Sequence, residues 1–269
     1  MQTKDVQGQL WSTAPTDWVQ LLEPTFIPMY QGVLSQIHLN DEQLLLDAGC
    51  GSGLFLSMAA TTGVHVHGID AAEGLLAVAK ERLPGTTLMR EDLVALPFID
   101  GTFDVVTGFN SFQYAGSFQS ALAEARRVVK WHGKLVIGIW GKEKDCEASS
   151  VQAAVNSLLP PPPPGTPDFF AAGEEGKIEA MCKEVGLKIL GKHSVFCPWQ
   201  FNSTKDLLRA FLCTAQCVKA VQVAGQEAVE SAVLTSAQPY AITDEVYYLR
   251  NYFTYFITEK INTQRNWIS

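Results

Sequence analysis

Between residues 44 and 140, short continuous apolar runs alternate with segments whose apolar residues have helical spacing. The apolar runs predict buried strands at 44–48, 64–69, 86–90, 103–108 and 134–140. The helically spaced segments predict helices at 53–61, 72–82 and 117–130. Strands that alternate with helices in this way form a parallel sheet with helices on both faces, so the pattern predicts an α/β, doubly wound fold.

The pattern changes on both sides of this region. Upstream, residues 13–17 read as a helix start, and Pro24 and Pro28 are expected to split the following apolar-periodic segment into two short helices. Downstream, helical spacing at 151–159, 173–185, 205–223 and 226–234 accompanies two further strand candidates at 187–201 and 247–260. The last two strands are therefore separated by a long helical segment, 202–245.

A glycine-rich turn follows the first predicted strand, with the sequence Asp-Ala-Gly-Cys-Gly-Ser-Gly at 47–53. Glycine lacks Cβ, so Gly49, Gly51 and Gly53 can adopt positive φ and allow a ligand to approach the backbone. The helix that begins near Ser52 directs free N–H groups at such a ligand. For this motif alone, an ordinary strand-to-helix turn is the alternative.

Acidic residues occur where three neighbouring strands are expected to end, at Asp47, Asp70 and Asp92. A carboxylate at Asp70 can accept hydrogen bonds from both ribose hydroxyls of an adenosine group. The dinucleotide fingerprint G-x-G-x-x-G is not met, because Leu54 occupies the place of its last glycine. The carboxylates would repel a pyrophosphate and attract a sulfonium cation, so they disfavour a nicotinamide-dependent oxidoreductase.

A series of ordered blocks between Leu44 and Gly141 resembles the class I S-adenosylmethionine-dependent methyltransferases, and in particular the small-molecule branch similar to the ubiquinone/menaquinone-biosynthesis enzymes. The blocks are 47–53, 68–71, 91–93 with 96–98, 103–106 and 127–135. One departure is Trp131-His132-Gly133, where the family usually has Pro-Gly-Gly. That turn is expected at the opposite edge of the sheet from the cofactor, so the departure concerns stability more than chemistry.

The resemblance implies a mostly parallel seven-stranded sheet whose last strand is antiparallel, and S-adenosyl-L-methionine as the cofactor. It assigns the methionine part of the cofactor to the glycine turn, the ribose to Asp70 and the adenine to Asp92 and Leu93. Asn110 is expected at the amino acid end of the cofactor. The cofactor-binding residues implied are Asp47, Gly49, Gly51, Gly53, Asp70, Ala71, Asp92, Leu93 and Asn110.

Three parts of one structural domain follow from the pattern and the resemblance. They are an N-terminal helical cap (1–40), a cofactor-binding Rossmann-like core (41–141), and the rest of the sheet with lid insertions near 147–172 and 202–245 (142–269). A contact in a homodimer is the alternative to a lid. The five consecutive prolines at 160–164 are either a stiff linker or a wall of the substrate pocket.

The reaction implied is methyl transfer to a small-molecule acceptor by in-line displacement, driven mainly by positioning of the reactants. No general base stands out, since His65 and His67 alternate on a strand and read as structural. The substrate-facing candidates are Gln113, Tyr114 and Trp140, because ligands gather at the carboxyl ends of strands. Neither the acceptor nor its reacting atom (O, N, S or C) follows from the sequence. A non-catalytic S-adenosylmethionine-binding protein is the main alternative.

Composition limits the remaining choices. The 269 residues carry a net charge of −8, which disfavours a nucleic-acid partner. The six cysteines form no C-x-x-C pair, so we expect reduced thiols in a cytoplasmic protein and no metal site. Residues 1–9 are too polar for a signal peptide, and no apolar run has the length of a membrane span.

Overall fold

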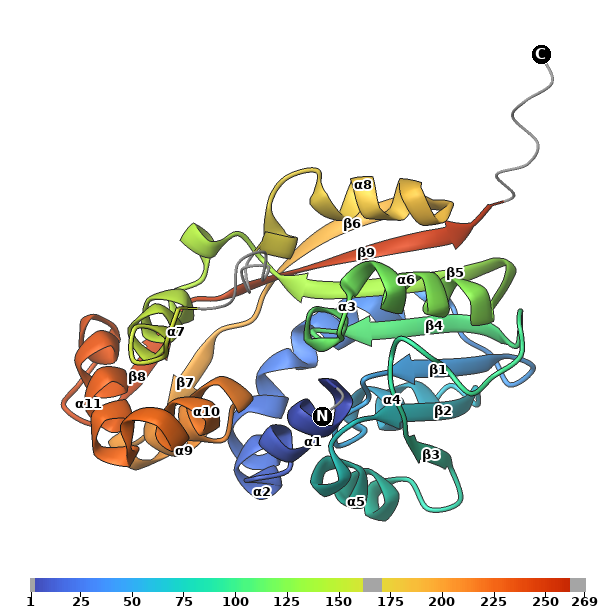
Figure 1. Ribbon diagram of the computed structural model, residues 1–269. Helices are drawn as coiled ribbons and strands as arrows, with labels where there is room; N and C mark the ends of the chain where they lie inside the picture. Colours follow the sequence, from blue (N-terminus) through green and yellow to red (C-terminus); the bar gives the residue numbers. More distant parts are fainter. Residues whose placement is uncertain (1–2, 162–170, 262–269) are drawn as a thin grey trace.

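The computed structural model describes residues 3–161 and 171–261, and its centre is a seven-stranded sheet with the order β3-β2-β1-β4-β5-β9-β6 (Figure 1). Its strands are β1 (Leu44–Ala48), β2 (His65–Asp70), β3 (Thr87–Arg90), β4 (Phe103–Phe109), β5 (Val129–Trp140), β6 (Leu187–Phe196) and β9 (Tyr252–Lys260). The first five pair in parallel, and β9 runs antiparallel to both β5 and β6. The predicted fold class, with its antiparallel last strand, is confirmed.

Helices cover both faces of this sheet and bury a separate apolar cluster on each. One face carries α3 (Ile27–Ile37), α4 (Leu54–Ala60) and α5 (Glu73–Arg82), whose core residues include Val33, Leu56 and Leu76. The other carries α6 (Phe118–Val128) and α8 (Lys177–Val185), with Leu122 and Ile178 in its core. Burial on both faces explains why the parallel strands read as continuous apolar runs.

The N-terminal segment is more irregular than its periodicity predicts. It consists of α1 (Thr3–Trp11), α2 (Pro15–Asp17), the π-helical turn η1 (Trp18–Leu22) and the 3₁₀ turn η2 (Glu23–Phe26), which together we call the cap and which lead into α3. Pro24 lacks an N–H and breaks the α-helical ladder, as expected. A helix begins at Pro15, within the predicted start at 13–17, and α1 precedes it as an element that the pattern did not predict. Helix α1 has few apolar residues. It packs closely against the segment before α5, where a Cβ at Gly8 would lie 2.3 Å from the Ala71 carbonyl oxygen.

A second group of elements, which we call the lid lobe, lies beyond the carboxyl ends of the parallel strands (Figure 1). It contains α7 (Ala148–Asn156), α9 (Thr204–Leu212), α10 (Ala215–Ala224), α11 (Gln226–Ala237) and a small antiparallel sheet of β7 (Trp199–Phe201) and β8 (Tyr247–Leu249). Short 3₁₀ turns are η3 (Phe112–Tyr114), η4 (Glu143–Asp145), η5 (Ala171–Gly173) and η6 (Gln238–Tyr240). Most of the polyproline run falls on 162–170, outside the described residues.

Several predicted element boundaries are wrong for identifiable reasons. The strands predicted at 187–201 and 247–260 are each interrupted, so β7 and β8 leave the main sheet and pair with each other. Pro198 cannot donate to a ladder, and the buried Asn251 accepts the Ala148 N–H at 3.0 Å instead of continuing a strand. The helix predicted at 205–223 is divided at Thr214, whose hydroxyl accepts the Cys217 N–H at 3.4 Å as an N-cap.

Two further boundaries differ. The helix predicted at 117–130 ends at Val128, because strand β5 already begins at Val129. The helix predicted at 173–185 begins at Lys177, directly after Gly176, which has a φ of +83°. Within 3–161 and 171–261 no single helix is long and apolar enough to cross a membrane; α9 and α10 reach that criterion only when joined, and they are bent by 91°.

Candidate functional site

The glycine turn between β1 and α4 has the backbone conformation that its sequence predicts. Gly49 and Gly51 have φ of +89° and +53°. The N–H groups of Gly49 and Cys50 both donate to the Ile69 carbonyl, at 2.8 and 2.9 Å, which ties the turn to β2. A Cβ at Gly49 would lie 2.3 Å from the Ser111 Cβ, so no other residue fits there without displacement.

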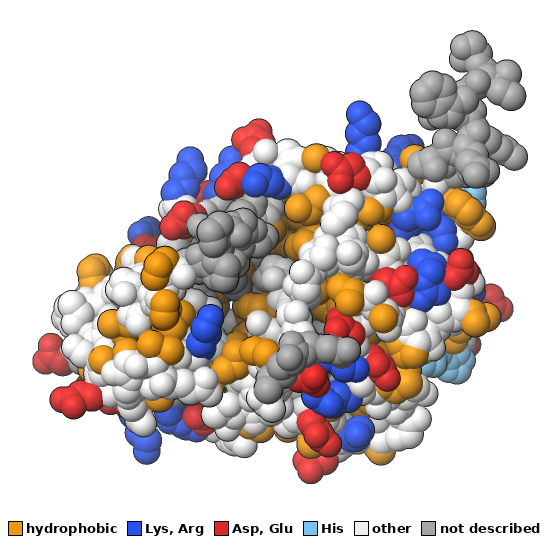
Figure 2. Space-filling view, viewed as in Figure 1, with side chains coloured by type: hydrophobic (Ala, Val, Ile, Leu, Met, Phe, Trp, Pro, Cys, Tyr) orange, Lys and Arg blue, Asp and Glu red, His pale blue; other side chains and the backbone are white. Residues whose placement is uncertain are grey.

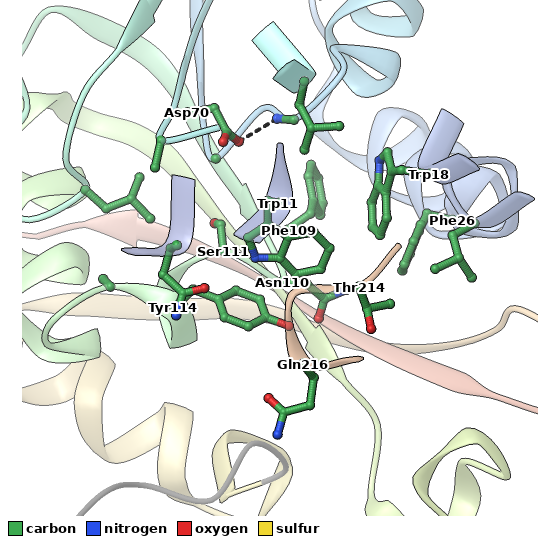
Figure 3. A pocket seen from close by; sticks show the side chains of 18 of the residues that line it. Trp11, Trp18, Phe26, Asp70, Phe109, Asn110, Ser111, Tyr114, Thr214 and Gln216 are labelled. Carbon is green, nitrogen blue, oxygen red and sulfur yellow. Dashed lines mark hydrogen bonds between the residues drawn. The ribbon is translucent and has the colours of Figure 1, made fainter. Parts of the chain in front are cut away.

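Asp70 at the end of β2 holds this turn from the other side. Its carboxylate accepts the Gly51 N–H and the Ala72 N–H, each at 2.8 Å (Figure 3). Burial raises the pKa of this carboxyl group, and the backbone hydrogen bonds oppose that shift. The residue also lines a cavity of the described structure, so its remaining lone pairs can serve a ligand.

That cavity lies at the carboxyl ends of the parallel strands, between the cap and the lid lobe. It encloses about 1250 Å³ including its open mouth, more than one drug-sized ligand requires. Figure 2 shows hydrophobic side chains along the margin of the hollow between the lid lobe and the sheet. We call one part of it the polar end, lined by Lys4, Gly49, Gly51, Asp70, Ala71, Glu91, Asp92, Leu93, Asn110 and Ser111.

The other part, which we call the aromatic end, is built from segments far apart in the chain. Its aromatic lining residues are Trp11, Trp18, Phe26, Tyr30, Phe109, Tyr114, Trp140, Trp199 and Phe211, and its other lining residues are Leu22, Ala148, Gln152, Thr214 and Gln216. Figure 3 shows Asp70 at one side of the cavity and Gln216 at the opposite side, with rings between them. Side chains of the cap and of both insertions therefore reach the same cavity.

Most of the residues proposed from the sequence converge on this cavity. The polar end contains Gly49, Gly51, Asp70, Ala71, Asp92, Leu93 and Asn110, and the aromatic end contains Tyr114 and Trp140. Three candidates, Asp47, Gly53 and Gln113, do not line it. A Cβ at Gly53 would contact Ala79 at 3.2 Å, so this glycine serves the packing of α4 on α5.

Asp47 lies beneath the cavity floor. It is 2% exposed and accepts a hydrogen bond from the Thr107 hydroxyl at 2.6 Å. Burial raises the pKa of its carboxyl group to about 7, the Thr107 hydrogen bond lowers it, and the charge of Asp70 raises it further. Asp47 is therefore placed to influence the site through Asp70 and through the floor of the sheet.

Asn110 supplies an unused acceptor at the polar end. Its φ of +48° is unusual for a residue other than glycine, and its N–H donates to the Gly138 carbonyl at 2.8 Å. Its buried side-chain oxygen has no hydrogen-bond partner among the described residues. A buried acceptor without a donor is costly, so this oxygen suits a ligand that carries an N–H group.

A buried ion pair joins the cap to the glycine turn, and the sequence analysis missed it. Glu23 in η2 is 4% exposed and accepts two hydrogen bonds from the Arg82 guanidinium, at 2.8 and 2.9 Å. Ser52, which is also fully buried, donates its hydroxyl to Glu23 and accepts from Arg82 through its carbonyl at 2.8 Å. The sequence contains no local motif that predicts the pair, because its two partners are 59 residues apart.

Among the described residues, no histidine lines the cavity, and its carboxylates lie at the polar end. Of the two strand histidines, His65 is exposed, whereas His67 packs its ring against Phe103 with centroids 5.4 Å apart. Burial raises the pKa of the Tyr30 and Tyr114 hydroxyl groups at the aromatic end, so both stay neutral. Within the described parts of the chain, no three His, Cys, Asp or Glu side chains are grouped to hold a metal, and all six cysteines are buried with free thiols.

Comparison with solved structures shows which fold the chain shares. The chain resembles, at a TM-score of 0.62 and 17% identity, a protein of Bacillus halodurans described as a candidate methyltransferase, covering 87% of this chain and 99% of that one. Geranyl diphosphate C-methyltransferase of Streptomyces coelicolor, solved with S-adenosyl-L-homocysteine, matches at a TM-score of 0.53 and 15% identity over 87% and 78% of the two chains. The fold is thus the Rossmann-like fold of class I methyltransferases.

Sequence matches point to the same class. Residues 46–137 match the family described as "Methyltransferase domain", so this part of the chain is similar to that family. Demethylmenaquinone methyltransferase of Renibacterium salmoninarum is 38% identical over 95 residues, which is 35% of this chain and 40% of that relative. The similarity therefore covers the core around the glycine turn and spans less than half of that relative's length.

Proposed function

We propose that this protein is an S-adenosylmethionine-dependent methyltransferase that acts on a small-molecule acceptor. The observation that carries the proposal is the Asp70 carboxylate, hydrogen-bonded to the Gly51 N–H in the wall of a two-part cavity and located within the matched domain. The Streptomyces neighbour holds S-adenosyl-L-homocysteine, and the Renibacterium relative is named for a small-molecule reaction.

The residues of the polar end fit the three parts of this cofactor. Asp70 would accept from the ribose hydroxyls, and Asp92 with Leu93 would contact the adenine. The Asn110 side-chain oxygen, which has no partner among the described residues, suits the ammonium group of the methionine part. Asp70, Glu91 and Asp92 give this end an acidic lining, which favours a sulfonium cation.

Positioning accounts for most of the chemistry that the chain must supply. Bound S-adenosylmethionine provides a methyl group already activated by its positive sulfur. The cap and the lid lobe enclose the aromatic end, where Tyr114 and Trp140 can orient an acceptor and exclude water. Correct alignment of two reactants is worth about 7–11 kcal/mol of the barrier, so a dedicated base is not required for every acceptor.

Calorimetric titration of the purified protein with S-adenosylmethionine and S-adenosylhomocysteine tests the proposal. We expect saturable binding of both at one site per chain. A matched pair of variants locates it: Asp70→Asn should weaken binding, and Asp100→Asn, which changes a largely exposed carboxylate, should not. Absence of binding would refute the proposal, whereas binding without turnover in a broad acceptor screen would favour a non-catalytic binding protein.

A further inference from the structure

The two ends of the cavity differ sharply in charge. All ionised side chains that line it within the described residues lie at the polar end: Lys4, Asp70, Glu91 and Asp92. Lys4 is already engaged, since its ammonium lies 3.5 Å from the Glu91 carboxylate. The aromatic end contains no Lys, Arg, His, Asp or Glu among its described lining residues.

This distribution disfavours an anionic acceptor. A carboxylate or phosphate buried at the aromatic end would lose its hydration without gaining a cationic partner among the described lining residues. Among the described residues that line the aromatic end, no Lys, Arg or His is available to pair with such an anion.

A cationic acceptor is disfavoured for a different reason. On the proposed function, a sulfonium lies at the junction of the two ends, and a second positive charge a few ångströms away in a poorly hydrated cavity would be repelled. No carboxylate lines the aromatic end of the described structure to offset that repulsion. The acceptor must enter uncharged.

The carboxylates that line the cavity lie at its polar end, so the reacting atom is limited by the groups at the aromatic end. There, among the described residues, the titratable groups are the hydroxyls of Tyr30 and Tyr114, and burial raises the pKa of both so that they stay neutral. Neither can readily take a proton from an acceptor alcohol or carbon acid. An acceptor with a free lone pair needs no such proton transfer.

We propose, on the basis of the function proposed above, that the acceptor is an uncharged ring compound whose nucleophile is a weakly basic nitrogen, either heteroaromatic or a tertiary amine attached to an aromatic ring. The nitrogen lone pair forms the new bond to the methyl carbon, the carbon–sulfur bond breaks, and its electron pair stays on sulfur. No proton is released, and the positive charge passes from sulfur to the product nitrogen. The aromatic rings of Trp11, Trp18 and Trp140 line this end and would stabilise a developing positive charge by cation–π interaction.

Equilibrium dialysis with compounds of one size tests the charge selection without relying on turnover. The protein, loaded with S-adenosylhomocysteine, is dialysed against isoquinoline, 2-naphthoate and 2-methylnaphthalene. We expect the two neutral compounds to bind at least about tenfold more tightly than the anion. Weak or absent binding of isoquinoline, or equal binding of 2-naphthoate, would contradict the proposal.

A charge-swap variant provides the matched control. Gln152 on α7 lines the aromatic end, so Gln152→Lys should improve 2-naphthoate binding by about tenfold, whereas Gln152→Met should leave it weak. If Gln152→Lys does not improve the binding of 2-naphthoate relative to the neutral compounds, the charge of this end does not select the acceptor.

The charge transfer itself has a separate readout. The affinity of N-methylisoquinolinium, a cation, is measured for the protein loaded with S-adenosylhomocysteine and for the protein loaded with S-adenosylmethionine. Uncharged 2-methylnaphthalene, which has the same shape, corrects for any other difference between the two forms. After this correction the cation should bind the S-adenosylhomocysteine form at least about tenfold more tightly. An equal ratio in the two loaded forms would contradict the placement of the sulfonium beside the acceptor. Failure of both cofactor forms to bind in calorimetry would instead refute the proposed function.

Discussion

Replacement of Glu23 by Gln tests whether the buried ion pair fixes the cap on the glycine turn. The substitution keeps the size of the side chain and removes the charge that faces Arg82 and the Ser52 hydroxyl. Breaking a buried pair costs about 3–5 kcal/mol. Arg82 is 23% exposed and keeps its 2.8 Å bond to the Ser52 carbonyl, so we expect a loss of about 2–3 kcal/mol.

Urea and thermal denaturation measure this loss. A change of that size should lower the Tm by about 5–10 °C in a domain of this length. Glu175→Gln is the control, because Glu175 is 84% exposed and lies 3.5 Å from its partner Lys142, so its loss should stay within about 0.5 kcal/mol.

A double-mutant cycle with Arg82→Met isolates the pairwise part of the effect. The interaction energy of Glu23 and Arg82 should exceed about 1 kcal/mol. Additive effects, or a loss from Glu23→Gln no larger than that of the exposed control, would show that the cap is held by apolar packing alone.

Three further predictions concern the turn and its two carboxylates. Asp70→Ala should weaken S-adenosylmethionine binding by about 1–3 kcal/mol, measured by calorimetry, because a charged acceptor of two hydroxyls is lost; unchanged affinity would remove Asp70 from the site. Burial raises the pKa of the Asp47 carboxyl group in the folded state from its ordinary value of 3.8 to about 7, so the folded state binds the proton more tightly. The stability of the wild-type protein should therefore fall as pH rises between these two values, by at most about 4 kcal/mol. Asp47→Asn should flatten that fall in urea titrations at pH 5 and pH 8, and equal slopes in the two proteins would disprove it. Gly49→Ala should lower the free energy of unfolding by more than about 2 kcal/mol and abolish cofactor binding. Gly85 has a similar φ of +82°, but a Cβ there would have nothing within 4 Å, so Gly85→Ala should lower that free energy by only about 1 kcal/mol. Equal losses of stability would show that backbone strain alone matters.

The parallel half of the fold could be predicted because its signals are local. Each buried strand reads as a continuous apolar run, and each covering helix follows directly in the chain. The turn at Gly49 and Gly51 and the carboxylate of Asp70 belong to the same local unit, so their meeting could be anticipated. The antiparallel position of β9 came from the resemblance and not from periodicity.

The rest depends on contacts between distant segments. Helix α1 is polar, and the packing of its Gly8 on Ala71 has no signature in the sequence. Trp18, Trp199 and Phe211 read as ordinary core residues until the fold brings their segments to one cavity. Asp47 is a different case: its position at a strand end predicts a cofactor contact, whereas the structure buries it against Thr107 and outside the lining of the cavity.

The central claim is that the polar end holds S-adenosylmethionine. Crystals of the protein grown with S-adenosylhomocysteine test it most directly. The account predicts the ribose hydroxyls on the Asp70 carboxylate, the adenine beside Asp92 and Leu93, and the sulfur directed toward the aromatic end. A nucleoside bound elsewhere, or a pyrophosphate-containing molecule in its place, would contradict it.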